Sequence, residues 1–248
     1  MLLVLPPSET KRDGGADGSA LELTGLRFPQ LTAQRQQAVR ALTRLSKSVS
    51  ASAEALGLGP TQRFEIDRNR AVRTAPTMPA IERYTGVLYD ALDAASLEKT
   101  ARSFLDRHVV IHSALLGPIG AGDAIPAYRL SHNSRLPGLQ LRTHWREPVA
   151  GVLGAHAGLV LDLRSESYVA LGPIRPDPRH LYLRVVSVGP TGQKKALTHF
   201  NKRGKGRFVR SLAAAGIDHA DADSLLAWAL ANGIALAPGA PGELELTV

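Results

Sequence analysis

Positive charge is concentrated in residues 189–217, and cations of this kind bind phosphate groups. This segment contains no Asp or Glu, and the whole chain has a formal net charge of +8. An ordinary solvated helix face, which is the alternative, mixes charges of both signs because like charges repel. The segment therefore predicts a contact with the phosphate backbone of DNA. The cations predicted to make this contact are Lys194, Lys195, Lys202, Arg203, Lys205, Arg207 and Arg210.

The same segment has the pattern of an amphipathic helix over residues 197–214. At about 100° per residue, an apolar arc separates from the cations. That arc comprises Leu197, Phe200, Gly204, Phe208 and Leu212. Glycines inside a helix cost roughly 1 kcal/mol each. Gly204 and Gly206 therefore predict either a close approach of another backbone or a break in the helix.

A second phosphate contact is predicted in the glycine-rich loop of residues 117–126. The sequence Leu-Gly-Pro-Ile-Gly-Ala-Gly at residues 116–122 resembles the hairpin of helix–hairpin–helix DNA-binding modules, with Gly and Pro in swapped order. Glycines allow a backbone to approach an anion closely, and a following helix would offer free N–H groups. Gly117, Gly120 and Gly122 are the predicted contacts, and a plain turn is the alternative. The pattern is not a dinucleotide-binding fingerprint, because Gly-x-Gly-x-x-Gly is absent.

A cationic pocket is predicted at the ends of the first two buried strands. Lys11 follows the first strand, and Arg129 follows the second strand and its glycine loop. Ligands of open α/β sheets collect at the carboxyl ends of strands, where two cations suit a phosphate or carboxylate. The predicted pocket residues are Lys11, Tyr84, Tyr128, Arg129 and Ser165. The alternative is an internal salt bridge of Arg129 with Glu9 or Glu166.

Complete catalytic motifs are absent. Ser8 and Lys11 have the Ser-x-x-Lys spacing of serine acyl-enzymes, but the accompanying motifs are missing. His108 and His112 are four residues apart yet bracket a strand, so no metal site and no cofactor are expected. An enzyme acting on DNA or a nucleotide, with glycosylase-like activity in the cationic pocket, is the alternative to a DNA-binding protein. A binder of small anions is a third possibility.

Composition is that of a globular protein of 248 residues with 44% hydrophobic and 21% charged residues. There is no cysteine, which excludes disulfides, thiolate metal sites and cysteine nucleophiles. No apolar run is long enough for a membrane span, and the N-terminus does not resemble a signal peptide. We therefore expect a cytoplasmic protein. Aromatic residues make up 5%, which favours contacts with duplex or branched DNA over stacking on single strands.

Strands and helices alternate along the chain, which favours a single compact domain over residues 1–248 with an α/β or α+β fold and a central mixed sheet. Strands are predicted at residues 2–5, 109–111, 159–163, 181–188, 234–236 and 243–248. Helices are predicted at residues 30–48, 52–58, 81–92, 96–107, 165–169, 197–214 and 223–231. Residues 61–78 are predicted to be irregular, and residues 189–192 to form a turn.

Several segments together resemble the YaaA peroxide-stress family. The opening strand and the following Pro-Pro-Ser-Glu-Thr-Lys at residues 6–11 are similar to the start of that family, with Lys11 matching its lysine. Trp145 stands where the family has a tryptophan. Further similar segments are residues 83–89, 112–117, 125–130, 161–168 and 198–206.

The resemblance extends from residue 2 to about residue 212. It implies an α/β domain with a positively charged cleft, a helix–hairpin–helix-like element, binding to DNA without sequence preference, and a role in the peroxide stress response. Two positions depart from the family pattern, since Ser131 and Ser167 stand where the family has acidic residues. Any chemistry that needs those carboxylates is not expected in this chain.

Overall fold

The sheet at the centre of the molecule is mixed. The computed structural model describes residues 1–188, 194–196 and 199–248. Eight described strands form the sheet in the order β4-β3-β1-β6-β7-β10-β9, with β8 paired to β7 beside this path. Each of β3, β1, β6, β7 and β10 is parallel to the next, and β4, β8 and β9 are antiparallel. The strands are β1 (Leu2–Leu5), β3 (Val109–Ser113), β4 (Gly117–Gly120), β6 (Val160–Asp162), β7 (His180–Val188), β8 (Lys194–Ala196), β9 (Leu236–Pro238) and β10 (Glu243–Thr247).

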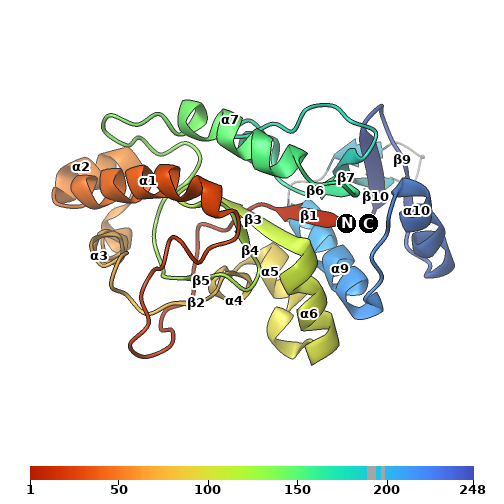
Figure 1. Cartoon of the computed structure of the whole chain (residues 1–248), viewed down its shortest axis with the longest axis horizontal. Helices are drawn as coiled ribbons and strands as arrows, with labels where there is room; N and C mark the ends of the chain where they lie inside the picture. Colours follow the sequence, from red (N-terminus) through yellow and green to blue (C-terminus); the bar gives the residue numbers. More distant parts are fainter. Residues whose placement is uncertain (189–193, 197–198) are drawn as a thin grey trace.

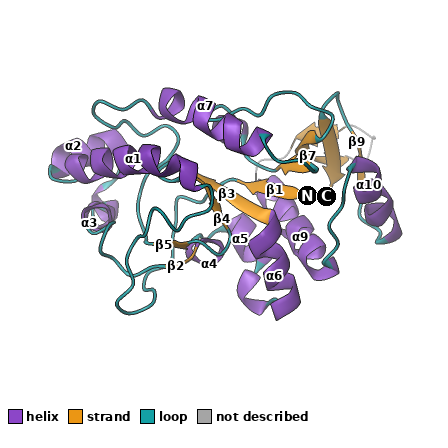
Figure 2. Cartoon of the chain, viewed as in Figure 1, coloured by secondary structure: helices purple, strands orange, loops and turns teal. Residues whose placement is uncertain are grey.

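Helices cover both faces of this sheet. They are α1 (Thr32–Leu45), α2 (Val49–Leu56), α3 (Phe64–Arg70), α4 (Ala80–Arg83), α5 (Val87–Leu92), α6 (Lys99–His108), α7 (Leu141–Gly154), α8 (Glu166–Val169), α9 (His199–Ala215) and α10 (Ala222–Ala231). Figure 1 shows α1 and α7 on one side of the sheet, and α5, α6 and α9 on the other. Helix α10 lies beside β9 at one end of the molecule, and α2 and α3 lie at the other end (Figure 2).

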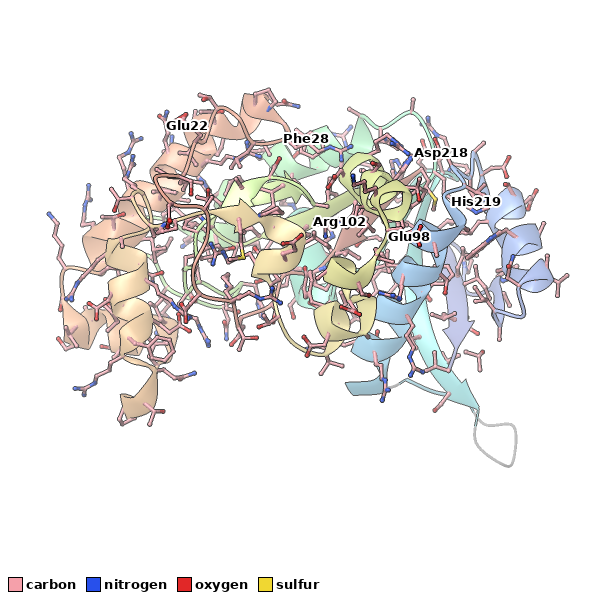
Figure 3. The ribbon with its side chains drawn as sticks, turned by 90° about the horizontal axis from the view of Figure 1, so that it is seen from below. Glu22, Phe28, Glu98, Arg102, Asp218 and His219 are labelled. Atoms are coloured by element: carbon pink, nitrogen blue, oxygen red, sulfur yellow. The ribbon has the colours of Figure 1, made fainter. Side chains whose placement is uncertain are left out.

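The predicted α/β fold with a central mixed sheet is confirmed, and most elements lie where the sequence pattern placed them. Strands β1 and β3 are buried along their whole length, as their unbroken apolar runs predict. The start of β1 is held by an ion pair between the N-terminal amine and Asp218, which lies between α9 and α10 (Figure 3). No helix among the described residues is long and apolar enough to cross a membrane.

Three stretches differ from the sequence prediction in their helices. Residues 61–78 are not irregular, because α3 occupies their middle and Met78–Pro79 forms strand β2, which pairs with β5 (Ala124–Ile125). The helix predicted over residues 81–92 is two helices, α4 and α5, separated where Gly86 takes a φ of +100°. Helix α7 was not predicted, because Pro148 and two glycines interrupt its pattern.

The predicted helix–hairpin–helix loop is wrong at residues 117–120, which form the buried strand β4 antiparallel to β3. Gly117 has a φ of +65°, and a Cβ there would lie 2.8 Å from the Trp145 ring. The Trp145 indole N–H donates to the Ala114 carbonyl at 2.8 Å, which fixes the ring against this glycine. The glycine therefore serves packing between β4 and α7, a long-range contact that the local sequence does not reveal.

Glycines in α9 serve a close approach between helices, one of the two outcomes that the sequence predicted. A Cβ at Gly206 would overlap the Leu88 carbonyl oxygen of α5 and lie 2.9 Å from the Ala91 side chain. A Cβ at Gly204 would lie 2.8 Å from the Val248 side chain. The absence of side chains at these positions therefore lets α9 pack tightly against α5 and against the end of the chain.

Candidate functional site

The outer side of α9 carries three exposed cations, Lys202, Arg203 and Arg207, which we call the α9 cationic face. Within the described part of the chain, none of the three has an ion pair or a hydrogen bond from its side chain. Unpaired guanidinium and ammonium groups on one helix remain available to external phosphates.

The other cations of the segment lie elsewhere. Arg210 is half-buried and donates to the carbonyls of Leu92 and Asp93, both at 2.8 Å, so it ties α9 to the end of α5. The backbones of Lys194 and Lys195 lie in β8, but their side chains fall outside the described residues. Their predicted role in DNA binding stays a prediction.

Lys205 does not face outward, which corrects its prediction as a DNA contact. Its side chain is only 3% exposed, and its ammonium donates to the Leu163 carbonyl at 3.0 Å. The ammonium also lies 5.2 Å from the centre of the Tyr182 ring. Burial lowers the pKa of Lys205 to about 8, with Asp162 opposing that shift. This lysine therefore joins α9 to the end of β6 and cannot reach a phosphate outside the molecule.

The predicted phosphate contacts in the glycine loop are also corrected. Gly117 and Gly120 are buried in β4, and the Gly120 N–H donates to the Asp123 carboxylate at 2.8 Å. That N–H group is already satisfied and has no access to a ligand. Gly122 is exposed, but no helix begins after it as the motif requires.

A glycine-containing connection also joins α2 to α3 at residues 57–63 and includes a short 3-10 helix (Pro60–Gln62). The sequence predicted the end of the first helix there but not α3. Helix α2 ends at Gly57 with a φ of 62°, and α3 begins five residues after Gly59. Arg63 and Phe64 are exposed at the start of α3.

Lys11 forms a buried cluster with two tyrosines at the carboxyl ends of β1 and β3. It is 6% exposed, and its backbone pairs with that of Tyr84. Its Nζ lies 4.2 Å from the centre of the Tyr128 ring and 5.2 Å from that of Tyr84. The same nitrogen donates to the carbonyls of Ser8 and Glu9 at 3.0 and 3.3 Å. The predicted association of Lys11, Tyr84 and Tyr128 is therefore present in the structure.

Burial lowers the pKa of Lys11 to about 7, because the enclosed site disfavours the charged ammonium. The Glu65 carboxylate opposes this shift, and the positive charges of Arg129 and Arg68 add to it. Lys11 therefore loses its proton more readily near neutral pH than an exposed lysine does. An amine of this kind can accept a proton or act as a nucleophile.

A chain of hydroxyl groups lies beside Lys11. Ser113 Oγ accepts hydrogen bonds from the backbone N–H groups of Leu115 and Leu116, at 3.0 and 2.9 Å. With both acceptor positions filled, its own proton goes to Tyr128 Oη, 2.6 Å away. Tyr128 Oη lies 2.7 Å from Tyr84 Oη. Burial raises the pKa of Tyr128 to about 12.

Arg129 forms the internal salt bridge that the sequence analysis kept as an alternative. Its Nη2 lies 2.6 Å from Glu9 Oε2, and its backbone N–H donates to Asn69 at 2.7 Å. Glu166 pairs instead with Arg184, at 3.6 Å. Arg129 thus lies beside Lys11 but is already neutralised. Ser165 is exposed at the end of β6, and no described contact joins it to Lys11.

A second buried polar cluster lies at the end of β6. Arg164 pairs with Asp162 at 2.6 Å and donates to His112 Nδ1 at 2.8 Å. Burial and the positive charge of Arg164 lower the pKa of His112 well below its usual value, so the ring is neutral. This network fixes β6 against β3. Lys205 belongs to it, so Lys11 and Arg129 share one cluster and Lys205 another. Among the described residues, no group of three His, Asp or Glu side chains could hold a metal ion.

Comparison with known proteins places the chain among bacterial relatives. The family model described as peroxide stress protein YaaA matches residues 1–232. A UPF0246 protein of Corynebacterium glutamicum strain R is 42% identical over 239 residues, which is 94% of each chain. A UPF0246 protein of Streptomyces coelicolor is 44% identical over 222 residues, covering 87% of this chain and 84% of the relative. The chain therefore belongs to the YaaA peroxide stress protein family.

Proposed function

We propose that this protein acts in the cytoplasmic response to peroxide stress by binding DNA through its backbone phosphates. The observation that carries the proposal is the α9 cationic face, where Lys202, Arg203 and Arg207 are exposed and unpaired within the described structure. Contacts of this type hold duplex or branched DNA without reading its sequence. The family model that matches the chain is described as a peroxide stress protein, and this description provides the cellular context for the proposal.

The glycine turn at residues 57–59 is the second proposed contact. The connection between α2 and α3 contains two glycines and a short 3-10 helix (Pro60–Gln62), and Arg63 adds an exposed cation to it. In Figure 1, α2 and α3 lie at one end of the long axis, and α9 lies past the centre toward the other end. A DNA segment that contacts both regions would therefore extend along the molecule.

A titration of a fluorescent duplex tests the proposal. The triple variant Lys202→Ala, Arg203→Ala and Arg207→Ala should bind at least roughly tenfold more weakly than the wild type. The reason is that its binding neutralises fewer phosphates and so releases fewer counterions from the DNA. The matched control replaces Arg40, Arg142 and Arg146, which are exposed on α1 and α7 on the other side of the sheet. Equal binding by the wild type and the α9 variant would refute the proposal.

An enzymatic function is the second candidate, and the Lys11 cluster favours it. A partly neutral amine with a pKa of about 7 lies against the ring of Tyr128, whose hydroxyl group belongs to the Ser113–Tyr84 chain. In a glycosylase-like reaction, the neutral amine nitrogen would bond to the sugar C1′ as the N-glycosidic bond breaks, and the departing base would take the first proton that the nitrogen loses. The C1′–O4′ bond would then break, with the second proton of the nitrogen passing to O4′, which leaves an imine between Lys11 and C1′.

Reduction with borohydride tests this candidate, because it converts an imine between Lys11 and the sugar into a stable bond. Duplexes containing an oxidised purine are incubated with the wild type and with Lys11→Met. A covalent adduct that forms only with the wild type supports the enzyme. Absence of both an adduct and released base excludes it for that substrate and leaves the DNA-binding proposal unaffected.

A further inference from the structure

A group of basic residues lies at the amino ends of the parallel strands, at the opposite edge of the sheet from the Lys11 cluster. The N-terminal amine, which precedes β1, pairs with Asp218 in the link between α9 and α10, residues 216–221. His108 is the last residue before β3, and its Nδ1 donates to the Met1 carbonyl at 2.9 Å and lies 3.9 Å from the Asp218 carboxylate. Asp218 therefore ties the link to the starts of two strands (Figure 3).

His219 follows Asp218 in this link and is buried. Its side chain is 1% exposed, and its Nδ1 lies 2.9 Å from Ser224 Oγ in the first turn of α10. Its Nε2 is enclosed and has no hydrogen-bond partner among the described residues. A protonated imidazole carries an N–H on both nitrogens. Protonation of the closed link would therefore leave a charged donor buried without an acceptor, which is unfavourable.

His156, in the loop between α7 and β6, has the same property. Its Nε2 is also buried and has no hydrogen-bond partner in the described structure. A Cβ at Gly158 would lie 3.3 Å from this nitrogen and 3.8 Å from the N-terminal nitrogen, so the ring and the amine both lie beside this glycine. A second histidine near the link is therefore enclosed in a way that disfavours its charged form.

The charges around the two rings also decide their protonation. Burial lowers the pKa of His156, and the positive charges of the amine and Arg27 add to this shift. Burial lowers the pKa of His219 as well, although the negative charges of Asp218 and Asp221 oppose the shift. The charged and titratable groups that face the two rings are the N-terminal amine, Arg27, His108, Asp218 and Asp221. Since both pKa values lie below that of a histidine in water, an open link binds protons more readily than the closed one.

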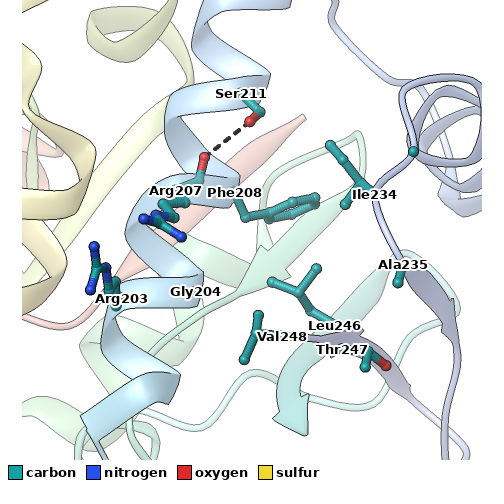
Figure 4. A pocket seen from close by; sticks show the side chains of 11 residues that line it. Arg203, Gly204, Arg207, Phe208, Ser211, Ile234, Ala235, Leu246, Thr247 and Val248 are labelled. Carbon is teal, nitrogen blue, oxygen red and sulfur yellow. Dashed lines mark hydrogen bonds between the residues drawn. The ribbon is translucent and has the colours of Figure 1, made fainter. Parts of the chain in front are cut away.

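Helix α10 is connected to this cluster by aromatic contacts. The rings of His219 and Trp228 have their centres 5.4 Å apart, and Trp228 lies 6.3 Å from the ring centre of Phe208 on α9. Figure 4 shows Phe208 pointing from α9 toward Ile234, which follows α10. If His219 moves into water, Trp228 loses one of its ring contacts and Ser224 loses its partner. Opening of the link is therefore transmitted to α10.

We propose that this cluster is a pH-sensitive latch, which holds the link between α9 and α10 closed at neutral pH and releases it when His156 and His219 take up protons in acid. Release gives both rings access to water and breaks the hold of Asp218 on the start of β1. The start of α10 then loses its support. The latch lies away from the Lys11 cluster, and it depends neither on DNA binding nor on an enzymatic reaction.

Hydrogen exchange of the full-length protein, measured by mass spectrometry at pH 7.5 and pH 5.0 and corrected for intrinsic rates, tests the latch. Protection of the α10 amides should fall at least roughly tenfold at pH 5.0, because a histidine with a free pKa near 6.5 favours the open link by that factor or more. Peptides from β3 and β4 should keep their protection. Equal protection of α10 at both pH values, or a loss of protection throughout the chain, would overturn the proposal.

The double variant His156→Gln, His219→Gln identifies the groups that titrate. Glutamine stays neutral at both pH values, so α10 in this variant should keep at pH 5.0 the protection that it has at pH 7.5. His132→Gln is the matched control, because His132 packs against the Tyr168 ring and lies outside the cluster. The control should respond to acid as the wild type does. A double variant with the acid response of the wild type would refute the latch.

Asp218→Asn provides a test in the opposite direction and does not depend on the folding of the glutamine variant. Asparagine has no charge to pair with the N-terminal amine, so the link should open more easily and α10 should already lose protection at pH 7.5. Protection of α10 equal to that of the wild type at pH 7.5 would show that Asp218 does not hold the link, and this result would overturn the proposal.

Discussion

The α9 cationic face and the Lys11 cluster differ in how deeply their cations are buried. Lys202 is exposed and unpaired among the described residues, whereas Lys11 is buried against two tyrosine rings and has a pKa of about 7. The exposed ammonium group is open to an external anion, whereas burial lowers the pKa of Lys11 toward neutrality. Burial, rather than residue type, therefore distinguishes these two lysines.

The largest expected effect comes from disturbing the support of the α9 cationic face. Gly206→Val should destabilise the fold by about 3 kcal/mol or more, because the side chain overlaps the Leu88 carbonyl and pushes α9 away from α5. Urea denaturation measures the change. Gly151→Ala is the control, since nothing lies within 4 Å of its added Cβ, and it should be neutral or stabilising. A fully stable Gly206→Val would show that the helix contact is looser than described.

A pH-dependent effect of a few kcal/mol should distinguish Lys11 from Lys202. The pKa of Lys11 falls from 10.5 when exposed to about 7 when folded, so between these values the unfolded chain binds more protons. The free energy of unfolding therefore rises as the pH increases from about 7 to 10.5, and this gain is absent below pH 7. Lys11→Met removes the rise.

Urea denaturation of the wild type and Lys11→Met at pH 7 and pH 9.5 measures this difference. Lys202→Met, at an exposed position, should show the same pH dependence as the wild type. A parallel pH profile for Lys11→Met and the wild type would mean that Lys11 is charged and solvated, which would remove the distinction between the two regions.

A smaller effect is expected from the hydroxyl chain beside Lys11. Tyr128→Phe removes the group that accepts the Ser113 proton and contacts Tyr84, so it should cost about 1–2 kcal/mol. Thermal unfolding measures the loss. DNA affinity should remain unchanged, because the α9 cationic face is intact. A large loss of DNA affinity with unchanged stability would place Tyr128 in the binding surface.

Local patterns predicted most of the strands and the basic helix. Apolar runs revealed β1, β3 and β6, and the spacing of Arg203 and Arg207 correctly placed them opposite Phe208. These features depend on residues close in sequence. They are therefore visible without knowledge of the fold.

The sequence predictions were wrong where contacts between residues far apart in the chain determine the structure. Considered alone, Gly117 indicated a turn. In the structure it is a strand residue whose missing side chain leaves space for the Trp145 ring. Lys205 is cationic like its outward-facing neighbours, yet carbonyl groups at the end of β6 accept hydrogen bonds from its ammonium. The clustering of Lys11 with Tyr84 and Tyr128 followed from the resemblance to the family and from the strand-end argument. The pairing of Arg129 with Glu9 was one of two open alternatives.

The salt dependence of duplex binding tests the central claim most directly. Each phosphate contact contributes about −0.9 to the slope of log affinity against log salt concentration. Replacing Lys202, Arg203 and Arg207 together by alanine should therefore make the slope less negative by about 2.7, while the variant of Arg40, Arg142 and Arg146 keeps the wild-type slope. An α9 variant with the wild-type slope would contradict the account.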